Sequence, residues 1–438
     1  MAISIAAAYP PHVLREYALL ADGERGALVG PRGDIAWMCA PRWHDDAVFA
    51  ALLGVESVYS VTPTDRYVWG GRYEDGTLIW HSRWVTVTGI VECRDALAFP
   101  GNPDRAVILR RIMAVAGPSR VRVLLAPRAE FGRFGLSGLT HEDGVWSGRC
   151  GPLHVRWSGA ADATNADART ASTKSRGSKS RGSKSGGSRS AGAESASTRS
   201  GRGQLALEIA LAQGEHHDLV LELSRTRFDD APPEPHVAWE STEHAWHAAV
   251  PPMDLTVAAD DARQSYAVLR GMTSASGAMV AAATMSLPER ADEGRNYDYR
   301  YAWIRDQCYA GQAVAACGPL PLLDSAVRFV SDRVLADGPD LAPAYTVTGE
   351  SVPDERALDL PGYPGGRSTV GNWVNRQFQL DNFGEVLLLL AAAARRDRLE
   401  LDHWRAAEVV VAALQTRWRE PDAGIWELDN RHWAHSLG

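Results

Sequence analysis

The sequence predicts a multidomain β + α fold, with a β-rich domain at residues 1–234 and a helical domain at residues 251–438. Up to about residue 158, short β-branched or aromatic runs alternate with Gly, Pro, Asp and Asn, which is typical of strands joined by turns. From residue 235, apolar residues recur at i, i+3 and i+4, the period of an amphipathic helix. Residues 235–250 are predicted as a linker helix that ends at Pro251-Pro252.

The number and spacing of the strand-like runs favour a β-sandwich. In one run Val121, Val123 and Leu125 alternate with Arg120 and Arg122, as in a strand with one buried face. The predicted strands are residues 57–62, 77–84, 84–93, 106–114, 120–126, 153–157, 204–211 and 217–223.

Residues 160–203 interrupt the strand pattern with Ser, Gly, Ala, Lys and Arg and show no apolar period. Such a segment buries too little apolar surface to offset its ordering entropy, so we predict a disordered loop between two strands. A tether for nucleic acid or another polyanion is the alternative. The chain has a formal charge of −8 in spite of this basic segment. The rest is therefore strongly acidic, which argues against a nucleic-acid-binding body.

The helical part is predicted to hold five further helices, and Asp402 is a candidate N-cap. A long loop rich in Gly and Pro separates two of them, and such loops are commonly functional. The predicted helices are residues 260–274, 304–316, 322–335, 377–396 and 402–419.

Several function classes are excluded by what the sequence lacks. No apolar run is long enough to cross a bilayer, and the N-terminus does not have the pattern of a secretory signal. The five cysteines are scattered and form no C-x-x-C pair that would indicate a metal or redox site, so we expect a reduced, cytoplasmic protein.

The segment Asn296-Tyr-Asp-Tyr-Arg-Tyr-Ala-Trp-Ile-Arg-Asp306 carries the strongest functional signal. Its aromatic faces can stack on sugar rings, and its carboxylates and guanidinium groups match pairs of sugar hydroxyls. An aromatic core segment with an internal Arg–Asp pair is the alternative. Residues 371–381, 422–427 and 431–436 again combine Trp with polar side chains. In the second of these a carboxyl group follows a Trp, an environment that raises a carboxyl pKa toward general-acid use.

These motifs resemble those of bacterial glycoside hydrolase family 15, which includes glucoamylase, glucodextranase and trehalase-like enzymes. The resemblance covers nearly the whole chain. It includes residues 17–22, 28–37 and 41–43 in addition to Tyr299-Arg-Tyr-Ala-Trp-Ile-Arg-Asp306 and Gly424-Ile-Trp-Glu427. It implies a supersandwich-like N-terminal domain, a linker helix, and an (α/α)6 barrel with the active site in its mouth.

By the family motif, Glu427 is expected to be the general acid that protonates the glycosidic oxygen. Arg305 and Asp306 are expected to bind hydroxyls of the terminal glucose. The further substrate-binding candidates are Trp303, Tyr301, Trp373, Arg376, Asp381, Trp426 and His435. His432 and His435 also fit a polar cluster, but they lack the spacing of zinc ligands.

The sequence departs from the family in two ways. In the family the general base lies well downstream of the general acid, and we expect it to be absent from these 438 residues. Substitutes are Glu350, Asp354 and Glu355, none of which is singled out by its spacing. Only about half of the barrel helices are expected, and a half barrel would expose a large apolar face. We therefore expect little turnover from this polypeptide alone.

The resemblance implies a hydrolase that releases glucose from the non-reducing end of trehalose or malto- or isomalto-oligosaccharides by inversion. No cofactor is required. One alternative is a catalytically dead sugar-binding remnant. Another is a half barrel that needs a partner chain. We expect an α-glucoside as the ligand and neither nucleic acid nor membrane as a partner. The sequence leaves open whether the chain forms a homo-oligomer and whether it pairs with a missing C-terminal half.

Overall fold

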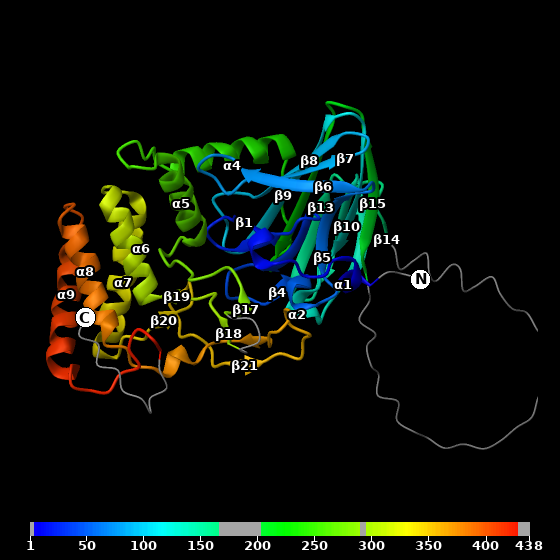
Figure 1. The fold of residues 1–438 in the computed structure, drawn as a ribbon. Helices are drawn as coiled ribbons and strands as arrows, with labels where there is room; N and C mark the ends of the chain where they lie inside the picture. Colours follow the sequence, from blue (N-terminus) through cyan, green and yellow to red (C-terminus); the bar gives the residue numbers. More distant parts are fainter. Residues whose placement is uncertain (1–3, 166–202, 290–294, 428–438) are drawn as a thin grey trace, which may run out of the picture.

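The computed structural model of the protein describes residues 4–165, 203–289 and 295–427. Two large sheets face each other on one side of the molecule, and the helices gather on the other side (Figure 1). The disorder prediction for residues 160–203 falls mostly outside the described residues. At its edges, β14 (Thr164–Asn165) pairs with β15 (Leu205–Leu211).

Both sheets of the N-terminal part are antiparallel. In order across the first sheet lie β1 (Ala18–Ala21), β2 (Gly26–Val29), β3 (Asp34–Cys39), β5 (Val58–Pro63), β10 (Ser119–Ala126), β15 and β14, with β4 (Ala47–Phe49) paired to β3. In order across the second lie β11 (Leu136–Glu142), β12 (Val145–Cys150), β13 (Leu153–Ser158), β16 (His216–Ser224), β9 (Arg105–Ala116), β8 (Ile90–Leu97), β7 (Trp80–Thr86) and β6 (Tyr67–Tyr73). Two short helices, α1 (Ile5–Ala8) and α2 (Ala129–Gly132), flank the sheets.

One apolar core lies between the two sheets, so the N-terminal part is a β-sandwich. Ile35 and Val61 of the first sheet share this core with Ile108 and Leu221 of the second. Each predicted strand run overlaps a strand, although residues 84–93 span the end of β7, a turn and the start of β8. The alternation predicted for β10 is confirmed, because its Val121, Val123 and Leu125 are buried while its Arg120 and Arg122 are exposed.

The helix α4 (Pro235–Ala249) covers the outer side of the second sheet (Figure 1). Trp246 stacks on Phe99 with ring centroids 4.0 Å apart. The guanidinium of Arg94 lies 4.4 Å from the centroid of the Trp239 ring. These buried aromatic contacts join the sandwich to the core of the helical part.

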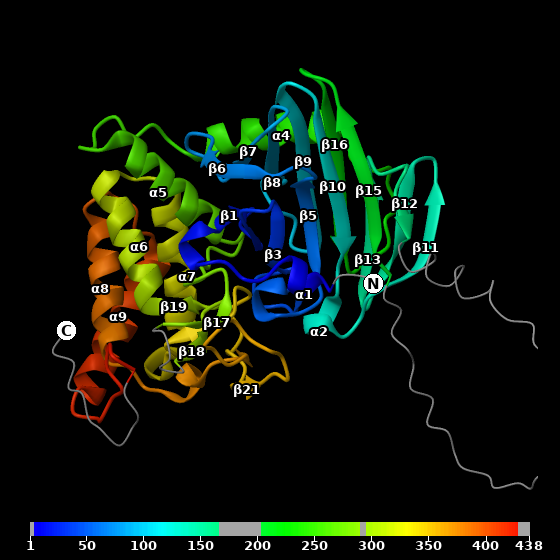
Figure 2. The same ribbon diagram turned by 45° about the vertical axis from the view of Figure 1, so that its right-hand side comes forward.

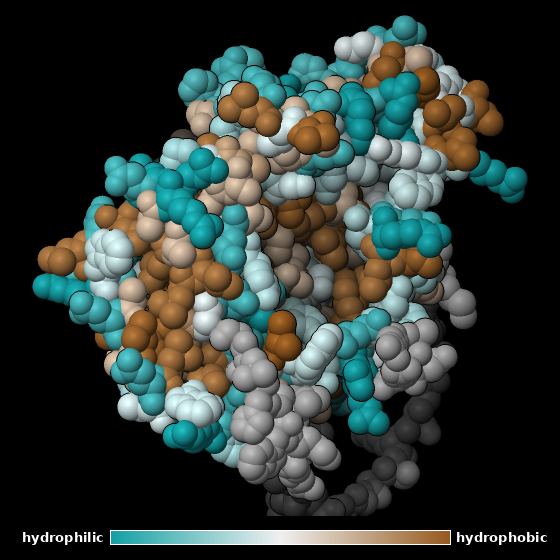
Figure 3. Space-filling view, turned by 60° about the vertical axis from the view of Figure 1, so that its left-hand side comes forward, coloured by the Kyte–Doolittle hydropathy of each residue, from teal (hydrophilic) through white to brown (hydrophobic). Residues whose placement is uncertain are grey.

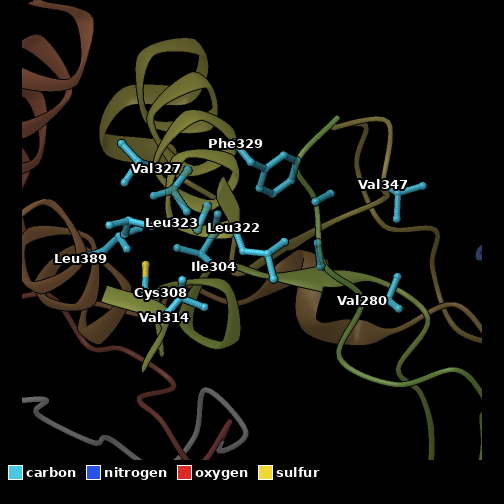
Figure 4. Packing of buried hydrophobic residues seen from close by; sticks show 14 of the residues in the cluster. Val280, Ile304, Cys308, Val314, Leu322, Leu323, Val327, Phe329, Val347 and Leu389 are labelled. Atoms are coloured by element: carbon cyan, nitrogen blue, oxygen red, sulfur yellow. The ribbon is translucent and has the colours of Figure 1, made fainter. Parts of the chain in front are cut away.

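The helical part contains α5 (Ala259–Met272), α6 (Ile304–Cys317), α7 (Pro321–Asp337), α8 (Asp381–Ala394) and α9 (Leu401–Arg417). Figure 4 shows their shared core, in which Cys308 and Val314 of α6 lie close to Leu323 of α7 and Leu389 of α8. Gly311 permits this packing, because a Cβ at that position would lie 2.4 Å from Cδ1 of Leu389.

Two boundary predictions are wrong. α8 begins at Asp381, four residues later than expected, because Gln377 is extended (φ −96°, ψ 146°) where it ends the short helix η4 (Trp373–Arg376), and residues 377–380 connect η4 to α8. Asp402 is not the N-cap of α9, since Glu400 occupies that position and forms a capping box with His403.

Apolar side chains also gather on the outer side of the helices (Figure 3). Leu388 of α8 and Trp404 and Val411 of α9 are among the exposed apolar side chains. Whether this face belongs to an (α/α)6 barrel stays a prediction. Within the described ranges no helix combines the length and apolar character needed to cross a membrane.

Short strand pairs fill the space between the sandwich and the helices (Figure 2). They bring the motif that begins at Asn296 into contact with residues 285–288, 344–345 and 369–372. The pairs are β17 (Met285–Pro288) with β18 (Asn296–Asp298), β19 (Ala302–Trp303) with β20 (Ala344–Tyr345), and β21 (Arg356–Ala357) with β22 (Thr369–Val370).

Candidate active site

A cleft of about 900 Å³ opens where α6, η4 and the turn before residue 428 meet. Its lining mixes aromatic rings with charged side chains, the combination that the sequence predicts for a sugar site. The lining residues are Ala281, Glu289, Arg295, Tyr297, Tyr299, Trp303, Arg305, Asp306, Asn372, Trp373, Arg376, Gln377, Ile425, Trp426 and Glu427.

The carboxyl group of Glu427 is held by two donors on one oxygen. Its Oε1 accepts hydrogen bonds from Nε1 of Trp303 at 2.9 Å and from Nη2 of Arg305 at 3.0 Å. Trp303 ends β19 and Arg305 lies in the first turn of α6, so two adjacent elements fix the donors.

The backbone of Glu427 has φ +52°, the left-handed region that a β-carbon disfavours. Its N–H donates to the carbonyl oxygen of Gly424 at 3.0 Å. The N–H of Ala423 donates to the carbonyl oxygen of Phe378 at 2.9 Å and anchors the start of this turn. A strained residue of this kind costs about 1–3 kcal/mol and persists where its surroundings require that conformation.

Arg305 links Glu427 to a polar group behind the cleft. Its Nη1 donates to Oε1 of Gln379 at 3.0 Å and lies 3.7 Å from Oδ2 of Asp381. Burial alone would lower the pKa of Arg305, but the hydrogen bond to Glu427 and the negative charges of the nearby carboxylates together outweigh burial, and the pKa is raised. Arg305 is therefore a permanent cation in the wall of the cleft.

Asp306 lies beside this pair, with its Oδ2 4.0 Å from Nε of Arg305. Burial raises its pKa, and the negative charge of Glu427 adds to the increase. Its position in the first turn of α6 places the carboxylate at the positive end of the helix dipole. The site thus combines two carboxyl groups and one cation at the N-terminus of α6.

Aromatic rings form two sides of the cleft. On one side the rings of Tyr299 and Trp303 lie 5.6 Å apart. On the other, Trp373 is 47% exposed and Cζ of Arg376 lies 4.4 Å from its ring centroid. Trp426 is 80% exposed at the rim. These rings present apolar faces of the kind on which a sugar stacks.

The structure brings most of the predicted site residues together. Seven line the cleft, namely Trp303, Arg305, Asp306, Trp373, Arg376, Trp426 and Glu427. Tyr301 is buried behind the wall, where its hydroxyl donates to Asp298 at 3.0 Å, so its side chain lies away from the cleft. Asp381 lies behind Arg305. His432 and His435 lie outside the described residues.

None of the three substitute bases lines the described cleft. Asp354 pairs with Arg376, and Glu350 accepts a hydrogen bond from Thr348. In the described ranges no group of three or more His, Cys, Asp or Glu side chains forms a metal site.

Sequence reasoning missed Glu289, Arg295 and Gln377 as lining residues. Glu289 accepts a hydrogen bond from the hydroxyl of Tyr299, and burial followed by this bond raises the pKa of Tyr299. Glu289 carries no local signal, because only the pairing of β17 with β18 brings it to the cleft. Gln377 belongs to the predicted segment 371–381 and could have been found there.

Comparisons with known proteins match both parts of the chain. Residues 262–437 match the family described as Glycosyl hydrolases family 15, and residues 7–180 match the domain described as Trehalase-like, N-terminal. A trehalase of Mycobacterium tuberculosis is 27% identical over 96% of this chain and 62% of its own length. A trehalase of Thermoplasma acidophilum is 35% identical over 35% of this chain and 26% of its own length.

Two further relatives differ in the activity that they are named for. The isomaltose glucohydrolase of Kribbella flavida is 31% identical over 39% of this chain and 43% of its own length. A crystal structure of a bacterial glucoamylase complexed with acarbose superposes with a TM-score of 0.56 at 12% identity, over 94% of this chain and 61% of that one. At that identity the superposition shows a shared fold. The chain thus spans about three fifths of the long relatives that it matches.

Proposed function

Because the chain belongs to glycoside hydrolase family 15 and has a trehalase-like N-terminal domain, we propose that its cleft binds the non-reducing-end glucose of an α-glucoside. In this proposal Glu427 protonates the glycosidic oxygen. The observation that best supports this role is that one oxygen of Glu427 accepts hydrogen bonds from both Trp303 and Arg305. Since Trp303 and Arg305 both donate to Oε1, we assign the proton transfer to Oε2.

The neighbouring groups suit the remaining tasks of such a site. Arg305 and Asp306 present a donor and an acceptor for adjacent glucose hydroxyls. The cation of Arg305 also stabilises Glu427 as a carboxylate once it has given up its proton. The exposed rings of Trp373 and Trp426 provide stacking surfaces for the sugar.

The reaction that we propose is hydrolysis with inversion, in which a second carboxylate activates water. In the described part of the cleft the other carboxyl groups are Asp306 and Glu289. Asp306 is paired with Arg305, and Glu289 accepts from Tyr299, so we assign both to substrate binding. The five free cysteines fit the cytoplasmic location that we propose.

Trehalose is the first substrate that we propose, and isomaltose and maltose follow. Support comes from the trehalase-like N-terminal match and from relatives named trehalase or isomaltose glucohydrolase. Calorimetric titration of the chain with trehalose, maltose, isomaltose and cellobiose tests the proposal, with glucose release measured in parallel. We expect at least one α-linked sugar to bind and the β-linked cellobiose to fail. Equal binding of cellobiose, or no binding of any sugar, would overturn it. Binding without release would favour a sugar-binding module.

A further inference from the structure

A buried ion pair, Asp298–Arg300, lies behind the cleft and is used by no step of the proposed reaction. Both side chains are fully buried. Arg300 donates from Nε to Oδ1 of Asp298 at 2.9 Å and from Nη2 to Oδ2 at 2.8 Å. A charged pair at this depth is costly unless its remaining hydrogen-bonding capacity is satisfied. The partners that satisfy it come from three separate parts of the molecule.

Asp298 binds both walls of the cleft. Its Oδ2 accepts from the hydroxyl of Tyr301 and from the N–H of Gly371, each at 3.0 Å. Its carbonyl oxygen accepts from Nδ2 of Asn372 at 3.1 Å. Tyr301 comes directly before β19, which ends at Trp303 in the first wall, and Asn372 caps η4, which carries Trp373.

Gly371 is needed for this contact. Its φ is +82°, and a Cβ there would lie 2.3 Å from the carbonyl oxygen of Asp354. The residue can therefore bring its N–H to the Asp298 carboxylate only without a side chain.

Arg300 binds the β-sandwich. Its Nη1 donates to the carbonyl oxygen of Asp45 at 2.7 Å and to Sγ of Cys39 at 3.1 Å. It also lies 3.4 Å from the carbonyl oxygen of Trp43. Cys39 ends β3, and Asp45 belongs to the loop that leads to β4. One side chain thus connects the first sheet to the site motif.

We propose that Asp298 and Arg300 are positioning residues through which the β-sandwich domain sets the distance between the two cleft walls. One wall carries Trp303 and Arg305, the other carries Trp373, and Asp298 is hydrogen-bonded to the start of both. Neither Asp298 nor Arg300 lines the cleft. The consequence for sugar binding rests on the proposed function, whereas the consequence for the rigidity of the walls does not.

Hydrogen exchange measured by mass spectrometry tests the proposal on the full chain. In Asp298→Asn we expect amide exchange in residues 296–306 and 369–377 to accelerate by about tenfold or more. In the unmodified chain, local opening of these segments has to break the ion pair, and in the variant this free-energy cost is gone. Asp95→Asn is the matched control, because Asp95 and Arg110 form an equally buried pair inside the sandwich. It should accelerate exchange in β8 and β9 and leave both walls unchanged.

Tyr301→Phe provides a milder variant that leaves no buried charge unpaired. It should accelerate exchange in the same two segments by a smaller factor. Two results would overturn the proposal. One is an unchanged exchange rate in both walls when Asp298→Asn and Tyr301→Phe are folded. The other is an equal acceleration of exchange in the walls by Asp95→Asn.

Titration with 1-deoxynojirimycin, a glucose-shaped iminosugar, adds a functional readout. We expect its Kd to rise by about tenfold in Asp298→Asn and to stay unchanged in Asp95→Asn. If the unmodified chain binds no iminosugar, the proposed function fails, while hydrogen exchange still decides whether the ion pair positions the walls. If the chain binds it and the Kd is insensitive to Asp298→Asn, the positioning role is wrong.

Discussion

Replacing Glu427 with Gln is expected to lower the rate of glucose release by about 10²–10⁴-fold, the usual contribution of a positioned general acid. Gln has nearly the same shape, and its amide oxygen can still accept from Trp303 and Arg305. The variant therefore keeps the orientation of the side chain and loses only the proton on the other oxygen. The measurement is the ratio of kcat for the two proteins on the sugar that binds best.

The affinity for that sugar should change by less than about threefold in the same variant, because the loss falls on a proton transferred in the transition state. A p-nitrophenyl α-glucoside should show a smaller drop in kcat, since its leaving group needs little protonation. Glu420→Gln serves as the control, because Glu420 is exposed and pairs with Arg417 instead of a cleft residue. A Glu427→Gln protein with unaltered kcat would exclude Glu427 as the acid.

Replacing Arg305 with Met is expected to weaken sugar binding by about 10²-fold or more. The side chain is 13% exposed and contacts Glu427, Gln379 and Asp381. Removing one partner of a buried charged hydrogen-bond group typically costs about 2–5 kcal/mol, much of it from the groups left unpaired. The midpoint of thermal unfolding should fall as well.

Arg376→Met offers a matched control within the same cleft. Arg376 is 57% exposed and pairs with Asp354, which is 55% exposed, so water screens the pair. Exposed pairs contribute about 0–1 kcal/mol, so the affinity should change by less than about fivefold. Calorimetric titration of both variants with the sugar measures the two affinities and checks this difference. Equal losses for Arg305→Met and Arg376→Met would show that the Arg305–Glu427 pair has no special part in binding.

The fold was largely predictable because its signals are local. Alternation along β10 and the i, i+3, i+4 period of α6 and α7 reflect which side of each element is buried, and both follow from sequence spacing. The start of α8 was harder to predict. Residues 377–380 have apolar and polar side chains that fit the helical pattern of α8, yet Gln377 is extended where it ends η4.

The site was predictable only where one continuous motif supplies it. Trp303, Arg305 and Asp306 lie within four residues of each other, and helix α6 places them together. Tyr301 was predicted to contact the sugar, but its hydroxyl donates to Asp298. The same carboxylate oxygen accepts from the N–H of Gly371, 73 residues along the chain. Such long-range contacts leave no periodic trace in the sequence. The same holds for Glu289, which a strand pairing brings to the cleft.

The most direct test of the account is affinity labelling with 2,3-epoxypropyl α-glucoside, followed by peptide mass spectrometry. Its epoxide lies on the leaving-group side, beyond the glycosidic oxygen, where it can reach the acid and its neighbouring carboxylate. The account predicts one adduct, on Glu427 or Asp306, that excess glucose prevents and that Arg305→Met strongly reduces. Adducts spread over surface carboxylates, with no protection by glucose, would contradict the claim that this cleft holds the terminal glucose of an α-glucoside.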